Sequence, residues 1–117
     1  MATFSKQKFS ESTDGLPIKI GATSIGSADT IHTAITGTTG FDEVWLYAQN
    51  SSTSDVKLTI CWGGTTDVDH TIEFTVAGKE GLKCVIPGLI LQNAKIIKAF
   101  AETANVLTVL GFVNRIE

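Results

Sequence analysis

Residues 105–115 read Asn-Val-Leu-Thr-Val-Leu-Gly-Phe-Val-Asn-Arg, and this stretch is apolar on both faces of the strand that it predicts. Side chains alternate between the two faces of a strand. One face carries Leu107, Val109 and Val113, and the other carries Val106, Leu110 and Phe112. In a small antiparallel sandwich one face of a strand normally meets water, so we expect another subunit or another protein to cover the second face. We assign the first set to the core and the second to that interface, and the opposite allocation stays open.

The composition favours strands and turns over helices. The chain has 117 residues, which is enough for one domain with a single core. Only 18% of the residues are charged, below the usual quarter, while Thr, Ser and Gly are abundant. Thr, Val and Ile fit a pleated surface well. We therefore expect an all-β protein.

The charge of the chain argues against two classes of partner. The formal net charge is −3 and the pI is about 5.3. Nucleic acids and anionic membranes both attract proteins with a positive field, so we expect neither as a partner. No apolar run approaches the roughly 20 residues of a membrane span, and the first residues lack the pattern of a signal peptide. We expect a soluble protein that is made in a cytoplasm.

About eight short segments after Gly15 have the patterning of strands, with turn residues between them. They are residues 16–20, 29–35, 43–49, 55–62, 70–77, 82–86, 95–103 and 105–115. This density predicts a single-domain antiparallel β-sandwich, jelly-roll-like, over residues 15–117.

Three details of this strand pattern carry structural predictions. We expect segments 43–49, 55–62 and 70–77 to form an antiparallel meander, and residues 89–93 to form a bend. Segment 95–103 also has helical spacing, but we favour a strand that pairs with the last strand across the turn at 104–105.

Residues 1–14 are polar, and we predict that they form a flexible N-terminal arm. Phe4 and Phe9 are the only large apolar side chains in this segment, so it cannot nucleate a core by itself. The two phenylalanines could anchor the arm on a neighbouring protein. Loose contact with the arm's own domain fits the sequence equally well.

The aromatic residues of the predicted strands offer one further kind of site. We place Trp62 in the core, in phase with Val56 and Leu58. Trp45 and Tyr47 share a strand face, and for them core filling and an exposed aromatic platform fit equally well.

The strongest candidate for a metal site is the segment Asp67-Val68-Asp69-His70. The carboxylates of Asp67 and Asp69 are weak candidates for binding Ca²⁺, because the loop lacks the spacing of a calcium-binding EF-hand. Asp, Thr and Gly are also the residues that a hairpin loop needs, and we favour that reading. We expect no metal and no cofactor.

No catalytic motif stands out. His32 and His70 are not close to a Ser or Cys in a recognisable nucleophile motif, and the glycine-rich stretches do not follow the phosphate-loop pattern. We do not expect an enzyme. Cys61 and Cys84 are expected to be reduced and to fill small sites in or beside strands.

Four segments carry a resemblance to a family of proteins. They are Leu-Pro-Ile-Lys-Ile at 16–20, Thr-Ile-His-Thr-Ala at 30–34, Asp-Glu-Val-Trp-Leu-Tyr-Ala-Gln-Asn at 42–50 and Val-Ile-Pro-Gly-Leu at 85–89. In these segments the chain resembles small virion structural proteins of tailed bacteriophages, most of all the head decoration (cement) proteins. The resemblance covers most of residues 15–116, and its motifs are strand and turn patterns.

The resemblance implies a β domain that binds the assembled lattice of the major capsid protein and stabilises the head by non-covalent contacts. Such a protein is usually a dimer or trimer and lies on the outer surface of the virion capsid. On this basis we expect a subunit interface at Val106, Leu110, Phe112, Trp45 and Tyr47. The capsid-binding arm would use Phe4, Lys6, Lys8 and Phe9.

Two other functions share the same composition and fold. A tail or baseplate structural protein differs only in its place on the particle. A carbohydrate-binding β-sandwich module would expose Trp45 or Tyr47 in a groove.

Overall fold

Nine strands form in the computed structural model of the protein, which describes residues 3–117. They are β1 (Phe4–Lys8), β2 (Ile18–Lys19), β3 (Asp29–Thr33), β4 (Phe41–Asn50), β5 (Val56–Trp62), β6 (Thr71–Val76), β7 (Lys83–Leu91), β8 (Ile96–Ala101) and β9 (Leu107–Ile116). The helix in this part of the chain is a short 3₁₀ turn at Ile25–Ser27, and no helix there is long and apolar enough to cross a membrane.

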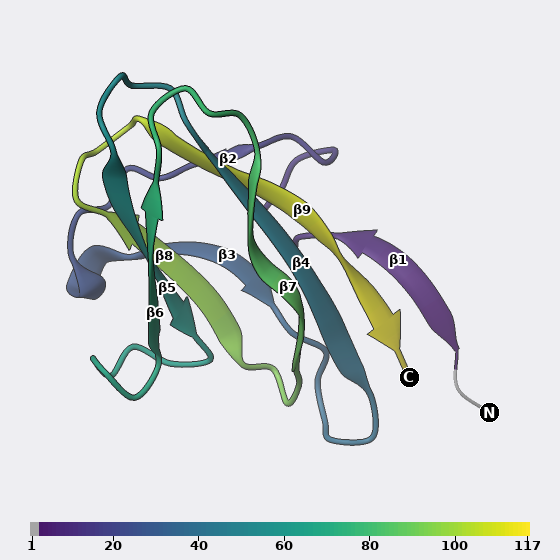
Figure 1. The fold of residues 1–117 in the computed structure, drawn as a ribbon. Helices are drawn as coiled ribbons and strands as arrows, with labels where there is room; N and C mark the ends of the chain where they lie inside the picture. Colours follow the sequence, from purple (N-terminus) through teal and green to yellow (C-terminus); the bar gives the residue numbers. More distant parts are fainter. Residues whose placement is uncertain (1–2) are drawn as a thin grey trace.

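The strands form two antiparallel sheets that pack face to face (Figure 1). Sheet A has the order β1-β9-β4-β7, with β2 also paired to β9, and sheet B has the order β3-β8-β5-β6. Apart from the β5–β6 hairpin, every paired strand has a partner that is distant in the sequence. This is the arrangement of a jelly roll, and it confirms the predicted all-β sandwich.

The core lies between the two sheets and is built by the inward positions of the long strands. In β4 the even-numbered residues are buried, and in β9 Leu107, Val109 and Val113 are fully buried. The allocation of these three residues to the core is therefore confirmed. Sheet B contributes Leu58, Ile60 and Ile97, among others, to the same apolar cluster.

The prediction of a flexible arm is wrong for residues 4–9. Residues 4–8 form β1, which pairs with β9 from Phe4 opposite Ile116 to Lys8 opposite Phe112. Phe9 is 0% exposed and belongs to the core cluster. The sequence hid this because β1 takes its stability from hydrogen bonds to a strand more than 100 residues away, which local patterning cannot reveal.

Phe9 is accommodated by a glycine in the opposite strand. Gly111 has φ +150°, and a Cβ atom there would clash with the carbonyl oxygen of Trp45 and lie 3.2 Å from the Phe9 ring. The absent side chain at an inward position of β9 thus leaves room for Phe9 to pack. The Phe9 ring also lies 5.7 Å from the imidazole of His32, between ring centroids.

Two predicted pairings are wrong because the chain crosses between sheets. Strands β4 and β5 lie in different sheets, so only the β5–β6 part of the predicted meander exists. Segment 95–103 does contain a strand, but β8 pairs with β3 and β5 instead of β9. The expected hairpin between β8 and β9 does not form. Around the turn that joins these strands, Ala101 N–H donates instead to Ala22 O, and Asn105 N–H donates to Ile20 O.

The predicted bend at 89–93 is largely a strand. β7 continues through Pro87 and Gly88 to Leu91, with two shifts of register against β4. Proline is tolerated here because β7 is an edge strand and its free side does not need the missing N–H.

We predict that Phe9→Ala destabilises the domain and Phe4→Ala does not. Truncating a fully buried phenylalanine costs about 3–5 kcal/mol through lost burial and the cavity that remains. Phe4 is 72% exposed, so its truncation should change the free energy of unfolding by less than about 0.5 kcal/mol. Urea unfolding of both variants measures the difference, and a loss of less than about 0.5 kcal/mol in both variants would show that residues 4–9 act as a loose arm.

Candidate interaction surface

The two outer faces of the sandwich have different chemistry. The outer face of sheet B is largely polar, and an exposed ion pair joins Lys57 of β5 to Glu73 of β6 at 3.6 Å. On β6, Thr71, Glu73 and Thr75 alternate with the apolar residues of that strand. The outer face of sheet A instead carries large apolar and aromatic side chains in the middle of its two central strands, β4 and β9, with polar residues such as Glu43 and Asn114 beside them.

Four side chains define what we call the aromatic face: Trp45, Tyr47, Leu110 and Phe112. Trp45 lies opposite Phe112 and Tyr47 lies opposite Leu110 in the β4–β9 register. Directly opposed residues share a face of the sheet, so the two pairs form a contiguous patch. All four are partly exposed, which places them on the side of sheet A that faces away from sheet B.

The aromatic rings of this face are held in fixed positions by their neighbours. The Trp45 and Phe112 rings are stacked with centroids 6.4 Å apart and an interplanar angle of 18°. The indole also lies against Gly88 of β7, where a Cβ atom would approach it to 2.9 Å. On the other side, the Lys6 ammonium lies 4.2 Å from the Phe112 ring centroid, a cation–π contact.

Glu43 completes the anchoring of Trp45. Its Oε1 atom accepts hydrogen bonds from Trp45 Nε1 at 2.8 Å and from Asn114 Nδ2 at 3.0 Å. These two donors lower the pKa of the Glu43 carboxyl group below its ordinary value. Trp45 therefore presents a rigid indole whose N–H is already paired, which suits apolar contact with a partner.

The apolar character extends beyond the aromatic face toward the ends of β4 and β9. Phe41 pairs with Ile116, and Ile116 also pairs with Phe4. On β7, Ile90 is 57% exposed beside Glu43. A hollow of about 310 Å³ lies between β1, β4 and β9 and is lined by Phe4, Ser5, Lys6, Glu43, Asn114 and Ile116.

The structure brings four of the five predicted interface residues together. Val106 is the exception, because it precedes β9 and packs against the core cluster. Of the predicted arm residues, Phe4, Lys6 and Lys8 lie exposed on β1 beside the aromatic face. Phe9 is buried and cannot contact a partner in this fold.

The loop that contains Asp67 and Asp69, the weak metal candidates, is stabilised by hydrogen bonds between its own residues. Asp67 Oδ1 accepts from the Thr71 hydroxyl at 3.2 Å, and Val68 N–H donates to the same Asp67 atom at 2.8 Å. Within residues 3–117 no group of three His, Cys, Asp or Glu side chains is placed to hold a metal ion. Asp67 acts here as a turn residue.

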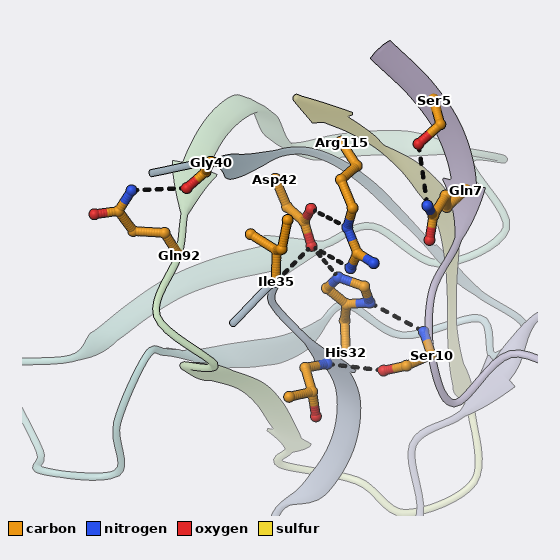
Figure 2. A network of polar contacts seen from close by, with 10 residues as sticks. Ser5, Gln7, Ser10, His32, Ile35, Gly40, Asp42, Gln92 and Arg115 are labelled. Atoms are coloured by element: carbon orange, nitrogen blue, oxygen red, sulfur yellow. Dashed lines mark hydrogen bonds and ion pairs between the residues drawn. The ribbon is translucent and has the colours of Figure 1, made fainter. Parts of the chain in front are cut away.

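A buried polar network that sequence reasoning missed links the two sheets (Figure 2). Asp42 of β4 is 0% exposed, and its carboxylate accepts four hydrogen bonds. Arg115 of β9 donates through Nε at 2.7 Å and through a terminal nitrogen at 3.0 Å, His32 of β3 donates through Nε2 at 2.7 Å, and Ile35 N–H donates at 3.2 Å. The sequence contains one indication of this network: Asp42 lies on the same strand face as Val44 and Leu46, which point into the core.

The geometry gives His32 a structural role. Its Nδ1 atom accepts a hydrogen bond from Ser10 N–H at 3.0 Å, so the ring is neutral and carries its proton on Nε2. The Ser10 hydroxyl is also engaged, as the acceptor of Thr33 N–H at 2.8 Å. Ser10, His32 and Asp42 are thus linked in a row by hydrogen bonds. The Nδ1 atom of His32 is the nitrogen that would take a proton from the Ser10 hydroxyl, but it already accepts the backbone N–H of Ser10.

Comparisons with protein-family models, with curated proteins and with solved structures found no match for this chain.

We predict that the domain loses stability as the pH falls below about 6.5. Burial lowers the pKa of His32 below its ordinary value of 6.5, and this outweighs the opposing hydrogen bond and charge of Asp42. Below pH 6.5 the unfolded chain therefore binds a proton that the folded chain does not, and the free energy of unfolding falls by up to about 1.4 kcal/mol per pH unit.

A second loss should begin as the pH falls below 3.8. Burial alone would raise the pKa of Asp42, but hydrogen bonds and charges from Arg115 and His32 outweigh it and lower that pKa below 3.8.

Urea unfolding between pH 4.5 and 8 checks the loss of stability assigned to His32, and His32→Gln is expected to remove the dependence of the unfolding free energy on pH in this range. His70→Gln is the matched control, because it removes an imidazole outside the network, and an unchanged slope in His32→Gln would contradict the assignment.

Proposed function

We propose that this chain is a head decoration protein of a tailed bacteriophage, which binds the assembled major capsid protein lattice and stabilises it by non-covalent contacts. The observation that carries the proposal is the aromatic face: an ordered, partly exposed patch on a sandwich whose other outer face is polar along β5 and β6. The resemblance of the four strand segments to decoration proteins supplies the location on the head.

The proposed mechanism is adhesion, in which binding energy is itself the function. Fully burying one large apolar side chain contributes about 1.5–3 kcal/mol. The four residues of the aromatic face are already partly buried, so each adds a part of this value when a partner covers it. The rigid stack of Trp45 on Phe112 reduces the entropy lost on binding. A repeated site on a symmetric lattice then strengthens modest single contacts through avidity.

In this proposal the aromatic face and the exposed side chains of β1 bind two different partners. The aromatic face closes a homodimer or homotrimer, as expected for Trp45, Tyr47, Leu110 and Phe112. Phe4, Lys6 and Lys8 lie at the border of that face and contact the capsid shell. The protein then resides on the outer surface of the virion capsid, after synthesis in the host cytoplasm.

We predict that Phe112→Asp weakens self-association at least thirtyfold. Truncation of a hot-spot residue at the centre of an interface costs 2 kcal/mol or more, about thirtyfold in affinity, and an aspartate adds an unpaired charge. The matched control is Phe100→Asp, which places the same charge on a partly exposed phenylalanine of β8, on the outer face of sheet B. Sedimentation velocity measures the oligomer, and thermal unfolding checks that both variants are folded.

An oligomer that survives Phe112→Asp unchanged contradicts this interface, and its disruption by Phe100→Asp would place the contact on sheet B. Tyr47→Glu provides a second variant on the aromatic face if Phe112→Asp does not fold. Binding to emptied heads, measured by co-sedimentation, then tests the capsid role with the same variants. Binding to tails but not heads would favour the tail or baseplate class, and glycan binding lost in Trp45→Ala would favour the carbohydrate module.

A further inference from the structure

Sheet A and sheet B each have two outer edges, and three of these four edges carry a feature that hinders pairing with another strand. An open edge presents unpaired backbone N–H and C=O groups to any extended chain. At the β7 edge of sheet A, Pro87 and two shifts of register break the regular spacing of these groups. At the β6 edge of sheet B, the Lys83 ammonium donates to the carbonyl oxygen of Thr75 at 3.0 Å.

The β3 edge of sheet B is closed by the segment that follows β1. Glu11 N–H donates to Ile31 O at 3.2 Å, and Thr33 N–H donates to the Ser10 hydroxyl at 2.8 Å. The pairing of β3 with β8 also contains a bulge between Thr30 and His32. An incoming strand would have to displace residues 10 and 11 from this edge.

In the part of the chain that the structure describes, the β1 edge has no proline, no shift of register and no chain segment or side chain bonded to its outward backbone groups. Thr3 and Glu117 exchange backbone hydrogen bonds in both directions. In an antiparallel pair such bonded pairs recur at every second residue, so the backbone N–H and C=O groups of Ser5 and Gln7 also point toward β9. The backbone groups of Phe4, Lys6 and Lys8 therefore point away from the sheet. Within residues 3–117 β1 pairs with β9 alone, in unbroken register, and it forms the outermost strand of sheet A (Figure 1).

The side chains of β1 indicate what kind of strand fits this edge. Lys6 and Lys8 share one face and are both exposed, and Phe4 on the same face is 72% exposed. A second copy of this chain is disfavoured, because an antiparallel β1–β1 pair centred on Lys6 would place two lysines directly opposite each other. Acidic side chains at alternate positions would complement both lysines.

We propose that the β1 edge binds an extended segment of a partner protein by strand addition, and that this segment reads acidic-x-acidic-x-apolar. In an antiparallel addition the acidic residues lie opposite Lys8 and Lys6, and the apolar residue lies opposite Phe4. The backbone of Phe4, Lys6 and Lys8 supplies up to six hydrogen-bonding groups to the new strand. This contact uses the edge of sheet A and does not depend on the aromatic face.

The test uses a synthetic peptide, acetyl-Thr-Glu-Thr-Glu-Thr-Val-Thr-amide, added to the ¹⁵N-labelled protein at up to millimolar concentration. Amide hydrogen exchange should slow at Phe4, Lys6 and Lys8 by at least tenfold when the peptide is bound. Ser5 and Gln7 are paired with β9 in the free protein, so their amide protection should change little. A peptide with Lys in place of both Glu residues should bind at least tenfold more weakly.

Charge-reversed variants test the role of the two lysines. Lys8→Glu should weaken binding of the Glu peptide by about tenfold, and it leaves the cation–π contact of Lys6 with Phe112 intact. Lys57→Glu is the matched control on sheet B, with the same change of net charge. The proposal is overturned if neither peptide binds, if both peptides bind equally, or if the exchange of amides outside β1 slows instead.

Discussion

The buried carboxylate of Asp42 is the interaction on which the arrangement of the two sheets depends. It joins β4 and β9 of sheet A to β3 of sheet B through Arg115 and His32. A charge without exposure to water is tolerated because four donors surround it, and removal of a donor would leave part of that charge uncompensated. His32 also accepts a hydrogen bond from Ser10 N–H, so the segment that follows β1 is fixed to the same network.

The aromatic face follows from this constraint. With Asp42 fixed inward, the alternation of β4 sends Val44, Leu46 and Ala48 into the core and turns Trp45 and Tyr47 outward. A slip of one residue would bury the wrong set and would break the Asp42–Arg115 pair, so the register is strongly specified. The same register brings Phe112 and Leu110 of β9 beside the two aromatic residues. Internal stability and the proposed binding surface are thus two sides of the same pair of strands.

Local alternation predicts strands well, whereas it says little about their partners. The two-sided pattern of β9 was visible in the sequence, and its inward residues are those that bury. By contrast, β1, the crossing from β4 to β5 and the separation of β8 from β9 depend on pairings between distant residues, so no local signal marks them. The candidate surface was partly predictable for the same reason: Trp45, Tyr47, Leu110 and Phe112 alternate with core residues. Val106 and Phe9 were misplaced because they lie just outside strands, where alternation ends.

The central claim is that the outer face of sheet A is covered in a larger assembly. Electron cryo-microscopy of virions that contain the protein tests this most directly, since it reports the location and the contacts of each subunit together. The account predicts density for the sandwich on the outside of the head, with Trp45 and Phe112 buried against a sister subunit. A particle in which the aromatic face points to solvent and the polar face of sheet B forms the contacts would contradict it.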